Sequence, residues 1–242
     1  MADKKVALVI GAGDATGGAI ARRFAREGYV AAIVRRNADK LEPLVKQIEA
    51  EGGAVRAFGV DARKEEQVVG LVETIEREIG ALEVAVFNIG ANVRFGIRET
   101  TARVYFKVWE MACFSGFLMG REAAKVMVPR GRGTILFTGA TASVRGRDGY
   151  SAFSGAKHAL RALAQSMARE LGPQGIHVAH TVIDGAIDTE WIRSNFPDRY
   201  KAKEHDGILN PDHIAEHYWL LHRQPRDTWT HELDLRPWSE SW

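Results

Sequence analysis

The segment from Tyr150 to Lys157 (YSAFSGAK) contains two side chains that can move a proton. A phenol can hand a proton to a substrate oxygen, and a nearby ammonium lowers the pKa of a phenol from its usual value of about 10. Six residues separate Tyr150 from Lys157, and a ring without a hydroxyl, Phe153, stands between them. The segment predicts acid–base chemistry if Tyr150 faces the same site as Lys157; a packing or loop role for Tyr150 is the alternative.

A glycine-rich turn, GAGDATGG from Gly11 to Gly18, follows the first apolar run of the chain. Glycines let the backbone turn tightly and approach a pyrophosphate, whose charge sits at the N-terminus of the next helix. A turn in this place predicts a dinucleotide site, with a plain strand-to-helix turn as the alternative. The predicted contacts from the turn are Gly11, Gly13, Ala15, Thr16 and Gly17.

Short apolar runs rich in β-branched residues alternate with amphipathic stretches, and such runs are typical of parallel strands buried on both faces. Parallel strands require crossover connections, which helices supply here. The pattern predicts one doubly wound, Rossmann-type α/β domain over residues 1–242. The predicted strands are Val6–Ile10, Val30–Val34, Val55–Val60, Val84–Phe87, Thr134–Thr138 and Val178–Ile183, and the predicted helices are about 17–28, 39–51, 64–79, 103–127 and 153–171.

The composition limits the classes of partner. The net charge is +2, from 33 basic and 31 acidic side chains, so no strong field predicts binding to nucleic acid or to an anionic membrane. The first apolar run is too short for a signal peptide or a membrane span. The single cysteine, Cys113, is compatible with a reducing compartment. We therefore expect a cytoplasmic protein that acts on a small-molecule substrate.

The turn and the Tyr150–Lys157 segment together resemble the short-chain dehydrogenase/reductase family, and the resemblance extends over about residues 5–190. It implies a nicotinamide dinucleotide cofactor and a homodimer or homotetramer built through the fourth and fifth helices. It also implies that Lys157 binds the nicotinamide ribose. The further cofactor contacts that it implies are Asp61, Ala62, Asn88, Gly90, Gly185, Ile187 and Thr189, the first of these beside the adenine and the last at the nicotinamide carboxamide.

The residues after the second predicted strand bear on the choice of cofactor. Arg35 and Arg36 stand where an acidic residue would favour the unphosphorylated ribose of NAD(H). Guanidinium groups instead suit a 2′-phosphate, because they form charge-assisted bonds to its oxygens. The pair therefore favours NADP(H), although Asp14 nearby opposes it. NAD(H), with the arginines as a solvated loop pair, is the alternative.

The resemblance fails at the catalytic positions. The family relays protons through an asparagine, a serine, a tyrosine and a lysine, whose positions here hold Cys113, Ala140, Phe153 and Lys157. Thr141 stands beside the serine position. Loss of a positioned general acid costs on the order of 10²–10⁴-fold in rate, so ordinary ketone or alcohol chemistry is disfavoured.

Tyr150 offers one replacement for the missing acid. Its spacing from Lys157 is similar to that in the enoyl-acyl-carrier-protein reductases, a divergent branch of the family. Attack on a conjugated C=C bond places charge on a carbonyl oxygen two bonds further away, so the phenol should stand further out. Two functions follow: an oxidoreductase acting on a small or thioester-linked substrate, with an activated C=C bond as one candidate for the reacting group, or a non-catalytic dinucleotide-binding sensor or partner subunit.

The segment at about 189–210 takes the place of the family's substrate lid. Trp191, Phe196 and Tyr200 are expected to form an apolar pocket there, with Arg193 and Arg199 available for an acidic group. Further along, His213 and His217 have the spacing of metal ligands on one helix face, but no third ligand is identifiable and the helix looks exposed. No metal site is predicted.

Overall fold

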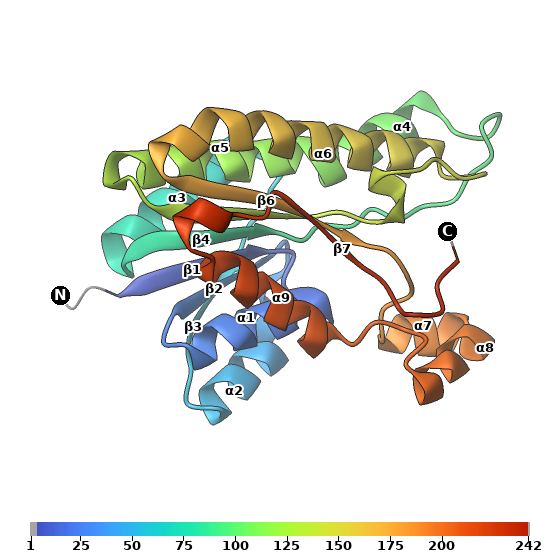
Figure 1. The fold of residues 1–242 in the computed structure, drawn as a ribbon, viewed down its shortest axis with the longest axis horizontal. Coiled ribbons are helices and arrows are strands. Elements are labelled where there is room, and N and C mark those ends of the chain that lie inside the picture. Colours follow the sequence, from blue (N-terminus) through green and yellow to red (C-terminus); the bar gives the residue numbers. More distant parts are fainter. Residues whose placement is uncertain (1–3, 242) are drawn as a thin grey trace.

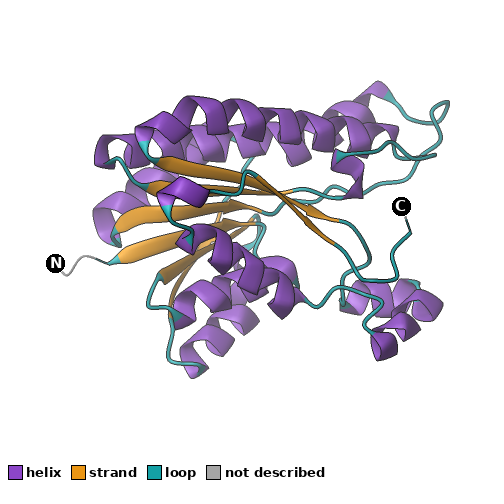
Figure 2. Cartoon of the chain, viewed as in Figure 1, coloured by secondary structure: helices purple, strands orange, loops and turns teal. Residues whose placement is uncertain are grey.

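The computed structural model describes residues 4–241 and contains a seven-stranded sheet with helices on both faces (Figures 1 and 2). Every neighbouring pair of strands is parallel, in the order β3-β2-β1-β4-β5-β6-β7. This confirms the predicted doubly wound fold. The strands are β1 (Lys5–Ile10), β2 (Val30–Arg35), β3 (Ala54–Gly59), β4 (Ala81–Phe87), β5 (Gly133–Thr138), β6 (Ile176–Ile183) and β7 (Glu232–Leu235).

Each face of the sheet has its own hydrophobic core. One core packs α3, α5 and α6 on the sheet, and the other packs α1, α2 and α9 on the opposite face, below the sheet in Figure 1. The short helices α7 and α8 stand apart from both layers, near the carboxyl end of the chain. The helices are α1 (Thr16–Arg26), α2 (Glu42–Ala50), α3 (Glu65–Glu78), α4 (Ala102–Trp109), α5 (Ser115–Met127), α6 (Ser151–Leu171), α7 (Glu190–Asn195), α8 (Pro197–Tyr200) and α9 (Pro211–Arg223).

The strand order reverses between β1 and β4, and ligands of open α/β sheets bind at such a reversal. The loop after β1 is fixed there by close backbone contact. Gly11 has φ +89°, and a Cβ on it would lie 2.7 Å from the carbonyl oxygen of Asn88. The amide Nδ2 of Asn88 donates to the carbonyl of Gly11 at 3.2 Å, which ties the two loops together.

Two of the predicted elements are wrong in part. The single helix expected over 103–127 is two helices, α4 and α5, separated by a π-helical turn at Glu110–Phe114. Such turns re-aim side chains, and Met111 from this one faces the cavity described below. Strand β3 is mostly exposed instead of buried on both faces, because it is an edge strand with a neighbour on one side only.

Helix α9 is not the exposed helix that its sequence suggested. Ile214, Ala215, Tyr218 and Leu221 form a buried stripe at helical spacing in the core that α9 shares with α1, while His213 stays exposed. The Tyr218 hydroxyl is 2.7 Å from Thr138 Oγ1 at the end of β5. Within residues 4–241 no helix has the length and apolar character that spanning a membrane requires.

Candidate active site

A cavity of about 940 Å³ lies along the carboxyl edge of the sheet, from the loop after β1 to the start of α6. It brings together predicted site residues that are far apart in the sequence, from Gly11 to Ile187. Thr189 does not line it; the hydroxyl of Thr189 instead accepts a hydrogen bond from the amide of Ile192 at 3.1 Å and caps α7. The predicted site residues that line the cavity are Gly11, Gly13, Ala15, Thr16, Gly17, Arg35, Arg36, Asp61, Ala62, Asn88, Gly90, Tyr150, Lys157, Gly185 and Ile187.

The N-terminus of α1 forms one wall of the cavity. Its N-cap residue, Ala15, has no side chain that could accept from the free amides of the first turn. Thr16 Oγ1 is buried and has no hydrogen-bond partner among the residues described. A Cβ on Gly13 would meet only the Arg35 guanidinium, at 3.7 Å, so the backbone is open to a ligand. Free amides, a free hydroxyl and a cation together fit the phosphates of a dinucleotide.

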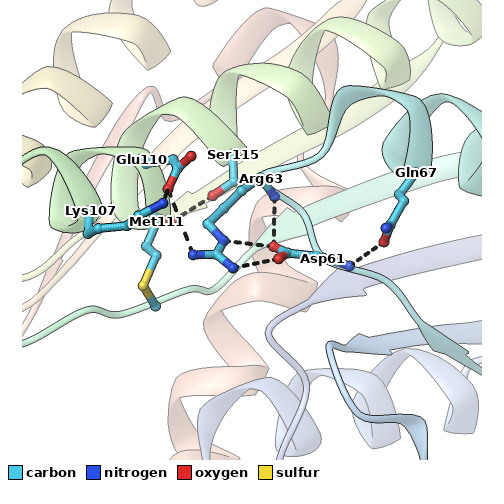
Figure 3. A network of polar contacts seen from close by, with 7 residues as sticks. All are labelled: Asp61, Arg63, Gln67, Lys107, Glu110, Met111 and Ser115. Carbon is cyan, nitrogen blue, oxygen red and sulfur yellow. Dashed lines mark hydrogen bonds and ion pairs between the residues drawn. The ribbon is translucent and has the colours of Figure 1, made fainter.

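The polar contacts around Asp61 fix a second wall (Figure 3). Arg63 donates to both carboxylate oxygens of Asp61, at 2.8 and 2.5 Å. These hydrogen bonds lower the pKa of Asp61 to about 2, so the carboxylate is charged at neutral pH. Glu110, from the π-helical turn, lies 3.7 Å from Arg63 on its other side. Asp61 is therefore held in one orientation at the end of the cavity where Arg35 and Arg36 lie.

Lys157 is the most constrained charged group in the cavity. Its side chain is 2% exposed, and Nζ donates to the carbonyls of Thr138 at 2.8 Å and Ile89 at 3.1 Å. Burial lowers the pKa of Lys157 to about 8. The ring of Phe153, one helical turn earlier, has its centroid 5.9 Å from Nζ. The ammonium thus lies beside an apolar ring at the position where the family's phenol is expected.

Tyr150 is the N-cap residue of α6 and lines the same cavity as Lys157. Its carbonyl accepts from the amide of Ser154 at 2.8 Å, so its backbone is fixed by the first turn of the helix. The residue is half-buried and packs against the small apolar cluster that contains Phe153. The structure therefore brings the two predicted proton-moving side chains to one site.

The other two positions of the family's relay hold groups that cannot replace it. Cys113 is buried, and burial raises the pKa of its thiol to about 11. Ala140 has no polar side chain, and its amide donates to Ser143 Oγ at 3.1 Å. Neither position presents a hydroxyl or an amide side chain to a substrate.

A polar group that the sequence analysis did not assemble lies beside Ala140. Thr141 donates to Asp184 Oδ1 at 2.5 Å, and Arg145 Nη2 lies 3.3 Å from the same oxygen. Asp184 follows a fully buried strand, β6, and a buried carboxylate requires partners. The position of Asp184 after an apolar strand could have predicted a buried carboxylate. The sequence could not show that Thr141 and Arg145 would be its partners.

The expected apolar pocket from the segment after Thr189 is wrong. Trp191 is 58% exposed and Phe196 is 48% exposed, and their rings contact each other with centroids 5.3 Å apart. Helices α7 and α8 are too short to bury an apolar face on the sheet, so these rings turn outward. Of the residues expected there, Arg199 lines the cavity, whereas Tyr200 and Arg193 do not.

The raised pKa of Cys113 predicts a slow thiol. At pH 8 we expect iodoacetamide to alkylate the native protein at least about 100-fold more slowly than the urea-unfolded protein, because the thiolate is scarce and buried. The native rate should rise about tenfold per pH unit towards pH 11. Cys113 is the single cysteine, so mass spectrometry reports on it alone. Equal rates in the two states would contradict this assignment.

Comparisons with known proteins agree with this geometry. The family model for short chain dehydrogenase matches residues 5–199. A short-chain dehydrogenase from Rhodopseudomonas palustris is 47% identical, with a TM-score of 0.83 over 98% of this chain and 100% of that one. An alcohol dehydrogenase from Thermococcus sibiricus, solved with 5-hydroxy-NADP, is 28% identical with a TM-score of 0.86 over 98% of each chain. Human dehydrogenase/reductase SDR family member 4 is 30% identical over 213 residues, which are 88% of this chain and 76% of the human protein.

A family model that matches residues 5–199, most of the chain, establishes the relationship. The chain belongs to the short-chain dehydrogenase family.

Proposed function

We propose that the protein is an NAD(P)(H)-dependent oxidoreductase that prefers NADP(H), with Tyr150 and Lys157 as its catalytic residues. The observation that carries the proposal is that both side chains line one cavity with the glycine-rich turn. The dinucleotide-binding walls described above and the 5-hydroxy-NADP bound by the Thermococcus sibiricus relative support the choice of cofactor. A bound nicotinamide would exchange hydride with the substrate, and the chain's own residues would position the substrate and move the proton.

Phe153 determines which substrates suit the site. A ketone placed against Lys157 meets an apolar ring instead of a phenol, and a missing general acid costs on the order of 10²–10⁴-fold. Tyr150 stands three residues earlier in the chain, one helical turn further from Lys157. A conjugated enoyl group, whose carbonyl oxygen lies further from the reacting carbon, would reach this phenol. We therefore favour an activated C=C bond, in a small or thioester-linked substrate.

The alternative is a non-catalytic protein that binds the dinucleotide as a sensor or partner subunit. Buried Phe153 and the high pKa of the Cys113 thiol favour it, because both positions have lost groups that move protons. Both functions require the dinucleotide to bind, and only the first requires turnover.

Reciprocal variants at Tyr150 and Phe153 distinguish the two functions. Tyr150→Phe should lower the turnover of enoyl thioesters by at least about 100-fold, because it removes the acid. Phe153→Tyr should raise the reduction of simple ketones by at least about tenfold, because it places a hydroxyl near the Lys157 ammonium. NADPH oxidation with enoyl thioesters, ketones and quinones measures both effects, with Leu220→Tyr on the exposed surface of α9 as the control. Tight NADPH binding without turnover in any variant would favour the sensor.

The preference for NADP(H) rests on Arg35, which lies next to Gly13 at the dinucleotide end of the cavity. Arg35→Gln should weaken the binding of NADPH about tenfold or more and leave the binding of NADH nearly unchanged, because it removes a charge-assisted bond to the 2′-phosphate. Fluorescence titration with both dinucleotides checks this, and Arg77→Gln, at an exposed position of α3, is the matched control. Equal losses for the two dinucleotides would contradict the assignment.

The proposal includes a homodimer or homotetramer formed through the fourth and fifth predicted helices, of which the fifth is α6 and the fourth is the pair α4 and α5. Support comes from a row of aromatic rings along these helices, Phe106, Trp109, Phe114 and Phe117, whose successive centroids lie 6.0, 5.8 and 6.1 Å apart. Phe106 is 56% exposed, and burial of such a row is worth roughly 25 cal/mol per Å².

Light scattering in solution tests this assembly. Phe106→Asp should shift the protein towards monomer, whereas Leu220→Asp, equally 56% exposed but on α9, should not. A wild-type protein that is monomeric by light scattering would refute the proposed assembly.

We also propose that the segment at about 189–210 acts as a substrate lid. Its Arg199 already lines the cavity, and Lys203 forms an ion pair with Asp188 at 2.7 Å at the base of the segment. Protection of this segment from proteolysis on adding NADPH and substrate would support its role as a lid.

A cytoplasmic location is part of the proposal, since Cys113 is a buried free thiol, and cell fractionation checks this location.

A further inference from the structure

The end of the cavity around Tyr150 carries an excess of positive charge. Three arginines line it, Arg145, Arg147 and Arg199, together with Lys157. Among the described residues that line this end, Glu240 supplies the carboxylate that faces them. A cavity wall with this balance attracts anions, since guanidinium groups pair well with carboxylate and phosphate oxygens.

An ion pair with the buried carboxylate of Asp184 holds Arg145 in place. Its Nη2 lies 3.3 and 3.4 Å from the two oxygens of Asp184, whose side chain is 3% exposed. Thr141 donates to the same carboxylate. The carboxylate of Asp184 therefore already has hydrogen-bond partners in the buried interior. The side chain of Arg145 is 37% exposed, on the side that faces the cavity. This arrangement fixes a cation at the cavity wall instead of neutralising it.

Arg147 and Arg199 are less constrained. Arg147 is exposed and forms no ion pair within residues 4–241. Arg199 comes from α8, and its Nη2 lies 3.5 Å from Glu240 Oε2. Both side chains belong to flexible types at the rim, so they can adjust to the shape of a ligand.

The carboxyl-terminal segment places oxygen atoms on these arginines. Besides the contact of Glu240 with Arg199, the carbonyl of Ser241 lies 3.4 Å from Arg145 Nη2. Both distances are at the long limit for a hydrogen bond, so these contacts are weak and exchangeable. Glu240 and Ser241 thus occupy the place that the oxygens of an anionic ligand would take.

We infer that this end of the cavity binds an oxyanion, a carboxylate or a phosphate, carried by the substrate, and that Glu240 competes with it. The position of the substrate rests on the proposed function. Arg145 supplies the fixed contact, and Arg147 and Arg199 close on the anion from the rim. The reacting bond then lies towards Lys157 and Tyr150, deeper in the cavity.

Binding of small probes tests the inference without turnover. Calorimetric titrations use inorganic phosphate, glycerol 3-phosphate, glycerate and glycerol on the protein saturated with NADPH, so that the dinucleotide fills its own phosphate sites. We expect glycerol 3-phosphate and glycerate to bind at least about tenfold more tightly than glycerol, and their affinity to fall with added salt. The comparison of glycerol 3-phosphate with glycerate shows whether phosphate or carboxylate is preferred.

Variants place the anion at this end. Arg147→Gln and Arg199→Gln touch no buried group, and each should weaken the binding of glycerol 3-phosphate about fivefold to tenfold. Glu240→Gln should strengthen it severalfold, because it removes the competing carboxylate. Arg77→Gln is the matched control, since Arg77 pairs with Glu78 at the end of α3 and does not line the cavity.

Equal affinity for glycerol and glycerol 3-phosphate would overturn the inference, as would undetectable binding of every anion or unchanged binding in both rim variants. Failure of the proposed function is a separate result, because it appears as NADPH binding without turnover or as a lack of NADPH binding. If NADPH does not bind, the same titrations on the protein alone still compare the rim variants with Arg77→Gln.

Discussion

The site depends on one buried cation. Lys157 extends from α6 to the carboxyl ends of two strands, where its ammonium is held by the carbonyls of Thr138 at the end of β5 and Ile89 after β4. Burying a charge is costly unless it is hydrogen-bonded, and these two carbonyls offset part of that cost. The remainder appears as a pKa of about 8 for Lys157. The contact fixes α6 against the sheet edge and thereby sets where Tyr150 and Phe153 stand.

That constraint explains why the substitutions in the family's relay matter. With Lys157 in place, the ring beside it decides what chemistry the ammonium can assist, and here the ring is Phe153. The Cys113 thiol, with a pKa of about 11, offers no path for protons at neutral pH. The proton source must then stand elsewhere along the cavity, and Tyr150 lines it. The polar group of Thr141, Asp184 and Arg145 does not restore the missing acid, because the Thr141 hydroxyl already donates to Asp184 and a guanidinium does not give up a proton.

The two ends of the cavity have the same arrangement of charges, an ion pair beside further arginine side chains. At the dinucleotide end, Arg63 fixes Asp61 beside half-buried Arg35 and exposed Arg36. At the other end, Asp184 fixes Arg145 behind the rim arginines. In each case an ion pair with low exposure fixes the orientation of one charged side chain. Further guanidinium groups then face the cavity. The cavity thus presents guanidinium groups at both of its ends.

The sequence by itself determined the parallel α/β fold, because β-branched runs and amphipathic stretches follow the periods of strands and helices. It also located the dinucleotide turn and Lys157, since glycine and lysine carry their roles in local spacing. Only the tertiary structure decided that Arg145 pairs with Asp184 and that α9 is packed, because such contacts join residues far apart in the chain. The outward turn of Trp191 and Phe196 likewise depended on whether α7 and α8 could reach the sheet, which local pattern does not encode.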